Sequence, residues 1–204
     1  MIVNDTYKTI ENISEGIYKD KKSKFLSFAF PVMNEDAVKE NLQKLKQTYY
    51  DANHHCFAWR LGLNDNNFRT DDNGEPSGTA GKPILGQIKS HQLTNILVVV
   101  IRYFGGIKLG TSGLIKAYKT AAADVLANAS IIEKNINNFY EISFPYNSIN
   151  DVMRIIKEES PEIKHQRFDI ECFMQISARL SKSDELVVRL GKIDGVRVEL
   201  LYSI

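Results

Sequence analysis

The feature that most constrains this fold is a long amphipathic helix that follows a buried strand. The segment Ile96–Ile101 is apolar at every position, which is typical of a strand covered on both faces. Glycines punctuate the exit from it, and apolar residues then recur at helical spacing. Such a helix must bury its apolar face against a sheet, so we expect a mixed α/β core. The predicted buried face consists of Leu114, Ile115, Tyr118, Ala121, Ala122, Val125, Leu126 and Ala129.

Weaker patterns predict the other elements of the first part of the chain. Helical spacing and early acidic residues favour a helix over 35–49, with Asn34 as its N-cap. Proline suits a first helical turn, so a short helix is expected over 83–91. Strands are expected over 24–32 and 56–63, and the second of them leads into a long polar loop.

The last third of the chain is predicted to be a second domain. A polar stretch over 133–138 separates it from the long helix, which predicts domains over 1–134 and 138–204. The expected order after this boundary is strand, helix, strand, strand, helix, strand, which is the ferredoxin-like arrangement. The predicted fold class is therefore α+β, with an N-terminal two-layer α/β domain and a C-terminal ferredoxin-like βαββαβ domain. The six elements are predicted over 139–144, 149–158, 163–168, 172–180, 183–191 and 196–202.

A glycine-rich loop, Gly74–Gly81, leads through Lys82 into a predicted helix. Glycine lets backbone N–H groups converge, and a helix N-terminus adds unpaired donors, so the loop can hold a phosphate or carboxylate. It is not a Walker P-loop, because Pro76 and Pro83 stand where that motif needs Gly and Ser or Thr. The alternative is a tight loop that uses glycine only for turns. The candidate residues are Gly78, Thr79, Gly81 and Lys82.

A second glycine-rich segment, 102–119, carries four basic residues and no acidic one. An exposed aromatic ring beside such charges could stack on a base, and a hydroxyl could cap the helix or meet a phosphate. The alternative is a solvated polar helix face below a glycine turn. The candidate phosphate- or nucleic-acid-binding residues here are Arg102, Tyr103, Phe104, Gly105, Gly106, Lys108, Thr111, Ser112, Lys116 and Lys119.

Metal or catalytic sites are not expected. His54 and Cys56 could share an ion on one face of a strand, but no Cys-x-x-Cys or His-x-x-x-His supplies further ligands. We expect no metal, no other cofactor and no catalytic residue. In an enzyme the acid or base would come from His54 or from the acidic loop residues Asp71, Asp72 and Glu75.

Composition narrows the class of protein. A hydrophobic content of 43% and a charged content of 25% are ordinary for a globular chain. A net charge of +1 argues against coating nucleic acid by bulk charge. Neither a membrane span nor a signal peptide is visible, and the two cysteines suggest no disulfide framework, so we expect a cytoplasmic protein.

The glycine-rich segments resemble signature segments of the IMPACT family, in its bacterial YigZ form. The segments that carry the resemblance are DNGEPSGTAGKPIL (72–85), NILVVVIRYFGGIKLGTSGLIKAY (95–118) and the upstream ANHHCFAWR (52–60). The resemblance implies a family domain over about 16–128, related in fold to the penultimate domain of translation elongation factor G. It also implies that the C-terminal domain is similar to a late domain of that factor.

The resemblance implies a role in the regulation of translation. Eukaryotic members restrain the kinase that senses amino-acid starvation by binding its activator, and they carry an additional N-terminal domain for partner recognition that is not expected in this chain. For bacterial members it implies binding of RNA, the ribosome or another nucleic acid. Our leading hypothesis is a translation-associated protein that binds such a phosphate-bearing partner in a glycine-rich basic cleft. The alternatives are an enzyme acting on a nucleotide or phosphorylated metabolite in the same cleft, and a protein-binding adaptor that uses the second domain's sheet.

Overall fold

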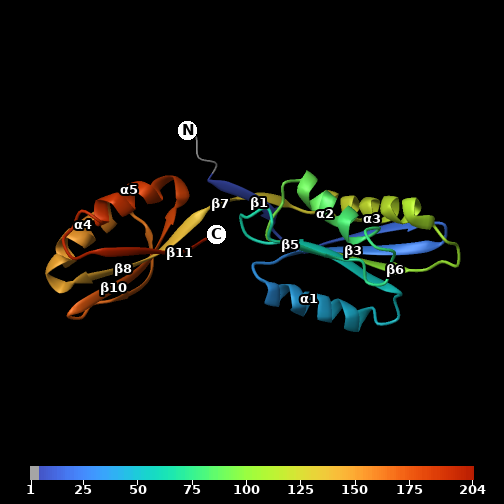
Figure 1. The fold of residues 1–204 in the computed structure, drawn as a ribbon, viewed down its shortest axis with the longest axis horizontal. Helices are drawn as coiled ribbons and strands as arrows, with labels where there is room; N and C mark the ends of the chain where they lie inside the picture. Colours follow the sequence, from blue (N-terminus) through green and yellow to red (C-terminus); the bar gives the residue numbers. More distant parts are fainter. Residues whose placement is uncertain (1–4) are drawn as a thin grey trace. The chain divides into compact units, whose positions relative to one another are not determined.

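The computed structural model describes residues 5–204, which form a mixed α/β fold with several sheets (Figure 1). The chain divides into two compact units. One unit is Tyr7–Glu133, and the other contains Lys134–Ile204 together with Asp5 and Thr6. No helix within residues 5–204 is long and apolar enough to cross a membrane.

The unit Tyr7–Glu133 is built on a five-stranded antiparallel sheet of order β2-β3-β6-β4-β5. The three central strands are those that the sequence predicted. The two edge strands were not predicted, because an edge strand is mostly exposed and its pattern is weak; β5 even lies inside the polar loop. The strands are β2 (Ser14–Asp20), β3 (Ser23–Pro31), β4 (His54–Arg60), β5 (Phe68–Asp71) and β6 (Ile96–Tyr103).

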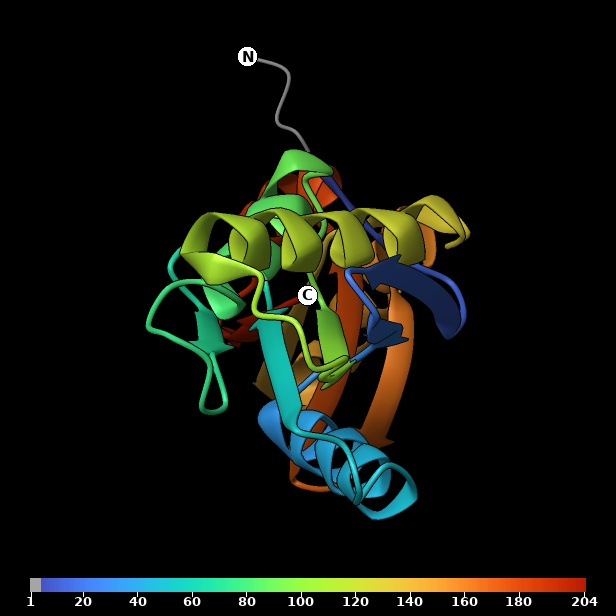
Figure 2. The same cartoon turned by 90° about the vertical axis from the view of Figure 1, so that its right-hand side faces the viewer.

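Helices cover both faces of this sheet. Two helices, α2 (Gly81–Ser90) and α3 (Gly110–Ala127), pack on one face, and α1 (Glu35–Thr48) packs on the other (Figures 1 and 2). Alternate residues of β6 therefore enter two different cores, one with Val98 and one with Val99. The predicted two-layer arrangement is wrong: a strand that is apolar on both faces needs a helix layer on each side.

Most of the residues that were predicted to lie on the buried faces of the helices are buried. Asn34 caps α1 by accepting a hydrogen bond from the backbone N–H of Ala37 at 2.9 Å. On α3, Tyr118 is fully buried, but Ile115 is 43% exposed, so its predicted place on the buried face is wrong. Ile115 lies at the edge of the apolar stripe of α3, where the surface of the helix that faces the sheet gives way to the surface that faces solvent.

The polar stretch 133–138 is not a free linker. It is occupied by the end of β7 (Ile131–Asn135) and the start of the next strand. β7 pairs with β1 (Thr6–Ile10) in a separate two-stranded sheet, which the sequence did not predict. Both strands are short and rich in polar residues, so their pairing leaves little trace in hydropathy.

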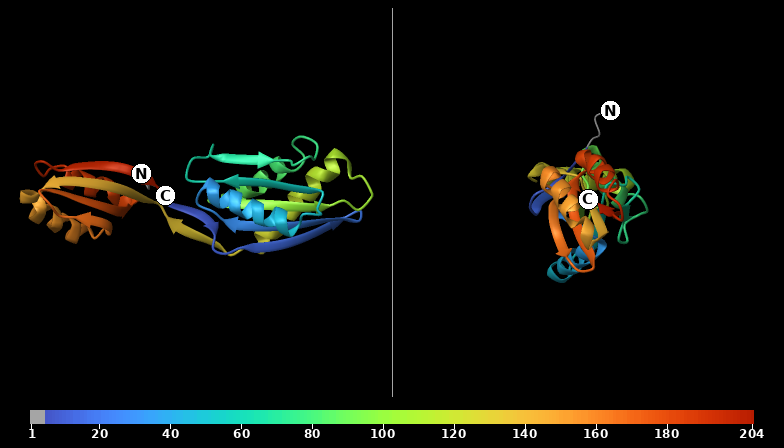
Figure 3. Two further views of the ribbon diagram at one scale, coloured as in Figure 1. Left: turned by 90° about the horizontal axis from the view of Figure 1, so that it is seen from below. Right: turned by 90° about the vertical axis from the view of Figure 1, so that its left-hand side faces the viewer.

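The unit ending at Ile204 has its elements in the predicted order. Its sheet has the order β11-β8-β10-β9, and the helices α4 and α5 lie on one face of it (Figures 1 and 3). The core between sheet and helices contains Ile142, Phe144, Val152, Met174 and Leu186. The elements are β8 (Asn137–Pro145), a 3-10 turn (Tyr146–Ser148), α4 (Ile149–Glu159), β9 (Glu162–Arg167), β10 (Glu171–Arg179), α5 (Leu180–Leu190) and β11 (Arg197–Ser203).

Candidate functional site

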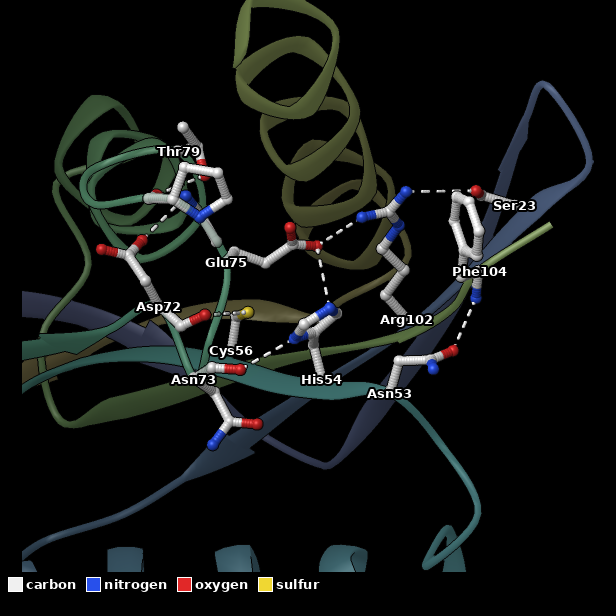
Figure 4. A network of polar contacts seen from close by, with 12 residues as sticks. Ser23, Asn53, His54, Cys56, Asp72, Asn73, Glu75, Thr79, Arg102 and Phe104 are labelled. Atoms are coloured by element: carbon white, nitrogen blue, oxygen red, sulfur yellow. Dashed lines mark hydrogen bonds and ion pairs between the residues drawn. The ribbon is translucent and has the colours of Figure 1, made fainter. Parts of the chain in front are cut away.

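A buried polar cluster lies between the central sheet and helix α3 (Figure 4). Its centre is Glu75, in the loop between β5 and α2, whose Oε1 accepts a hydrogen bond from Nη1 of Arg102 at 2.6 Å. The side chains of Arg102 and Glu75 are only 6% and 4% exposed. The hydroxyl of Tyr118, on α3, donates to the same oxygen at 2.8 Å. One carboxylate thus joins its loop to β6 and α3 by hydrogen bonds, and Nε2 of His54 on β4 lies 3.8 Å from the same oxygen.

Arg102 is not free to bind a phosphate, contrary to the prediction from the sequence. Its guanidinium charge was expected to meet a phosphate, but it is buried and neutralised by Glu75. Its other nitrogen Nη2 donates to the hydroxyl of Ser23 at 3.4 Å, and the guanidinium lies 5.6 Å from the centre of the Phe25 ring. A buried arginine already paired in this way is unavailable to a ligand unless the pair is broken, which is costly.

Cys56 and Tyr118 complete the cluster but are poor nucleophiles. The Cys56 Sγ lies 3.0 Å from the carbonyl oxygen of Asp72 and 3.3 Å from the hydroxyl of Tyr118. Burial raises the pKa of the Cys56 thiol to about 12. Burial also raises the pKa of the Tyr118 phenol, and Cys56 and Glu75 act in the same direction. Both groups are therefore protonated at neutral pH, and a thiolate mechanism has no support here.

The first glycine loop does form an anion-binding cradle, but the protein's own carboxylate fills it. Asp72 accepts hydrogen bonds from the backbone N–H groups of Gly78 at 2.7 Å, Ala80 at 2.9 Å and Gly81 at 2.8 Å. Burial alone would raise the pKa of this carboxyl group, but the three N–H donors outweigh it and hold the pKa below its usual range. The predicted phosphate site at Gly78 and Gly81 is therefore already occupied by Asp72.

The other two candidates of that loop differ in exposure. Thr79 is buried, and its hydroxyl donates to the carbonyl oxygen of Pro76 at 2.6 Å, so it serves the turn. Lys82 is exposed at the start of α2. Asp71, a candidate acid or base, accepts a hydrogen bond from the backbone N–H of Asn73 at 2.7 Å. His54 is held by its Nδ1, which lies 2.8 Å from the carbonyl oxygen of Asn73.

The second glycine loop packs against a hairpin that the sequence analysis missed. A Cβ on Gly105 would lie 2.0 Å from the carbonyl carbon of Lys22, so only glycine fits there. Lys21 and Lys22 form the two-residue turn between β2 and β3, and both have positive φ angles. Turns of that kind usually carry Asn-Gly or Asp-Gly, and the Lys-Lys pair therefore did not signal a hairpin.

Aromatic candidates beside this loop are only partly free. The hydroxyl of Tyr103 donates to Asp51 at 2.8 Å. Phe104 is 46% exposed, with the guanidinium of Arg102 5.5 Å from its ring centre. Gly106 has a φ of +85° and an open surrounding. Of the aromatic pair, Phe104 is thus the one able to stack on a ligand.

The remaining candidates are exposed on or beside α3. Thr111 and Ser112 lie in its first turn, but neither caps it: the helix follows Leu109, which makes no side-chain cap. We use the name lysine surface for the exposed residues Lys21, Lys22, Phe104, Lys108, Lys116 and Lys119. The ion pairs that lysines make within residues 5–204 involve Lys39 and Lys164, so the lysine surface keeps its positive charge. In the same described residues no group of three His, Cys, Asp or Glu side chains is placed to hold a metal ion.

Comparison with known proteins shows the family to which the chain belongs. Residues 21–126, which include both glycine loops, match the model of the Impact N-terminal domain. The chain belongs to the IMPACT family. It is 35% identical to the IMPACT family member YvyE of Bacillus subtilis, with 97% of this chain and 93% of that protein covered. It is 29% identical to the IMPACT family member YigZ of Escherichia coli, with 89% and 90% covered. A crystal structure described as a hypothetical protein matches with a TM-score of 0.76 at 25% identity, covering 98% of this chain and 99% of that one.

Proposed function

We propose that this IMPACT family protein is a translation-associated regulatory protein that binds RNA or the ribosome through its lysine surface. Membership of the family supports the link to translation, which is the role expected from the resemblance. The observation that carries the binding site is the uncompensated charge of Lys21, Lys22, Lys108, Lys116 and Lys119. Lysines without acidic partners suit a phosphate backbone, which dominates the affinity of most nucleic-acid complexes.

The proposal narrows the expected site to the second glycine loop and its surroundings. In the first glycine loop, the backbone N–H donors already bind the carboxylate of Asp72. In the buried polar cluster, Glu75 already neutralises the charge of Arg102. The loop of Gly105 and Gly106 has no such internal anion among the described residues, and Phe104 offers an exposed ring beside it. Charge and a stacking ring together suit RNA better than a small phosphorylated metabolite.

The buried cluster supports a structural role more than an enzymatic one. Glu75 and His54 would be its acid and base, but Oε1 of Glu75 already accepts from Arg102 and Tyr118. A general base must reach the proton that it abstracts, and a carboxylate held in a buried ion pair is poorly placed for that. We therefore propose a binding protein without a catalytic residue or cofactor, and place it in the cytoplasm with its partner.

The division into domains follows from the same proposal. The bounds expected from the sequence are 1–134 for an IMPACT-type domain and 138–204 for a ferredoxin-like domain similar to a late domain of elongation factor G; in the structure Asp5, Thr6 and Lys134 belong to the second unit. The element order from β8 to β11 and the sheet order β11-β8-β10-β9 support the second assignment. Two domains that both resemble parts of an elongation factor would suit a ribosomal partner.

Co-sedimentation with ribosomes over a salt series tests the proposal. Lys116 and Lys119 lie three residues apart on the exposed side of α3, so Lys116→Glu/Lys119→Glu should weaken binding without unfolding the protein. For each phosphate that is no longer neutralised, the slope of log affinity against log salt should become shallower by about 0.7–0.9. Lys44→Glu/Lys46→Glu, on the opposite helix layer of the sheet, is the matched control and should bind as wild type does. A folded α3 variant with wild-type affinity and slope would exclude this helix.

A further inference from the structure

In the unit ending at Ile204, the four-stranded sheet has one face that none of that unit's described helices covers. Side chains alternate along β8, so Ile142 and Phe144 enter the helix-covered core while Phe139, Glu141 and Ser143 point to the other face. This open face includes Phe139, Glu141, Ser143, Glu162, His165, Arg167, Phe173, Gln175, Ser177, Arg197, Glu199 and Tyr202.

Two aromatic rings form a platform on the open face. Phe139 and Tyr202 stack with ring centres 4.5 Å apart and an angle of 16° between their planes. Tyr202 is 54% exposed, and the ammonium of Lys164 lies 5.9 Å from the centre of the Phe139 ring. Beside the platform is a hollow of about 430 Å³, lined also by His165 and Gln175. Phe139 lies between Tyr202 and Lys164, and the outer face of Tyr202 is a flat apolar surface of the kind on which a nucleobase stacks.

Irregularities in both edge strands turn side chains toward this hollow. In β11 the register shifts between Leu200 and Tyr202, so Tyr202 pairs with Phe139 and shares its face. In β9 the register skips Lys164, between the residues that pair with Gln175 and Ile176. Each bulge adds a residue that lines the hollow, Leu201 in one strand and Lys164 in the other. Bulges that re-aim side chains are commonly functional features.

A second aromatic position lies farther along the same face. Phe173 on β10 lines an adjoining hollow of about 330 Å³ together with His165 and Arg167. Phe139 pairs with Ser177, four residues from Phe173, which places the two aromatic positions about 14 Å apart along the strands. The face thus offers two aromatic positions in a row. Arg167 lies beside Phe173 without an ion pair among the described residues, whereas Lys164 beside Phe139 is paired with Glu162 at 2.6 Å.

Two arginines on the edge strands of the face are free to meet a phosphate backbone. Arg167 and Arg197 form no ion pair within residues 5–204, and they flank the sheet as a phosphate-binding rim would. Glu141 and Glu199 lie opposite each other in its middle. An apolar protein surface would bury the Glu199 carboxylate without a partner and Glu141 with only the side-chain amide of Gln175, 3.4 Å away, which is unfavourable. Nucleobases instead carry N–H donors on their edges, which a carboxylate can accept.

We propose that this open face is a second binding site, and that it takes single-stranded RNA. One base stacks on the ring face of Tyr202 that is turned away from Phe139 and another on Phe173, while Arg167 meets the backbone. A four-stranded sheet with aromatic residues on its two middle strands is a known way to hold unpaired bases. The proposal shares its ligand class with the proposed function and rests on it to that extent, but it uses a different unit of the chain.

Fluorescence anisotropy with the full chain and labelled ten-nucleotide RNAs tests this site. Wild type should bind the single strands more tightly than an RNA duplex of the same length, because paired bases are not available for stacking. Phe139→Ala and Tyr202→Ala should each weaken binding by about 5- to 150-fold. Tyr202→Phe keeps the ring and should bind as wild type does, as should Tyr146→Ala, which removes an exposed ring of the same unit outside both hollows.

The outcomes separate this site from the lysine surface. If the aromatic variants lose RNA while Lys116→Glu/Lys119→Glu keeps it, the sheet site stands without the proposed function. If only the lysine variant loses RNA or ribosomes, the proposed function stands and the sheet site is overturned. Wild type that binds no single-stranded RNA at low salt also overturns it, as does a Tyr202→Ala variant that changes only self-association or the binding of a protein.

Discussion

Replacing Glu75 by alanine should strongly destabilise the unit Tyr7–Glu133. The change removes the acceptor that Arg102 reaches at 2.6 Å and that the Tyr118 hydroxyl reaches at 2.8 Å. Arg102 would remain 5% exposed with only the Ser23 hydroxyl at 3.4 Å. Its Nε has no hydrogen-bond partner among the described residues, so the guanidinium would keep only that one long hydrogen bond.

Breaking a buried pair from one side costs about 3–5 kcal/mol. For a unit of this size that corresponds to a fall in Tm of about 10–20 °C. Glu75→Gln keeps an oxygen acceptor and should lose less. Glu75→Ala/Arg102→Met removes the stranded charge and should recover part of the loss, because an apolar replacement of a buried pair is often tolerated.

Urea unfolding followed by tryptophan fluorescence measures this directly. Trp59 is the single tryptophan of the chain, and it is buried on β4, so its signal reports on this unit alone. The control is Lys39→Met, which breaks an exposed ion pair with Asp36 and should leave the urea midpoint unchanged. A loss below about 1 kcal/mol for Glu75→Ala, with an unchanged m-value, would refute the view that the pair stabilises the fold.

Three further predictions concern other parts of the same unit. The pKa of Asp72 in the folded protein is lowered from 3.8. The ionised carboxylate therefore stabilises the fold fully at pH values above 3.8, and this stabilisation is lost as the pH falls through the lowered pKa. In urea melts, the stability difference between wild type and Asp72→Asn should shrink between pH 6 and pH 3. In Gly105→Ala the new Cβ would lie 2.0 Å from a backbone atom of Lys22, so the NMR signals of the hairpin and the glycine loop should shift. In Gly106→Ala the new Cβ clashes with nothing, and the φ of +85° alone should lower the stability by about 1–2 kcal/mol. Cys56, fully buried with a pKa raised to about 12, should resist iodoacetamide at pH 8 until the protein is unfolded; rapid alkylation of native protein would contradict its placement.

Elements with strong periodicity could be predicted from the sequence. The face of α3 and the run of β6 follow from residues that repeat at fixed spacing, and the order of elements from β8 to β11 follows from the same signal. The edge strands β2 and β5 could not be predicted, because one side of an edge strand lacks partners and its residues are largely exposed. The continuous apolar run of β6 already implied a helix layer on each side of the sheet.

The sequence identified many residues of the candidate site but not the contacts between them. Spacing shows that glycines can gather N–H donors, but not that Asp72 fills the space they make. Arg102 and Glu75 are 27 residues apart, and only the folded sheet brings them together. The Lys21–Lys22 turn lies on the same surface as the second glycine loop, although Lys22 and Gly105 are far apart in the sequence.

Crosslinking of RNA to this protein in cells, followed by mass spectrometry of the attached peptides, tests the central claim most directly. Binding through the lysine surface predicts nucleotide adducts on peptides that contain Lys21, Lys22, Phe104 or Lys108, and their loss in the Lys116→Glu/Lys119→Glu variant. Recovery of ribosomal or other RNA with adducts at these positions is the expected result. Absence of RNA adducts anywhere, or adducts confined to α1 and the second unit, would contradict the claim.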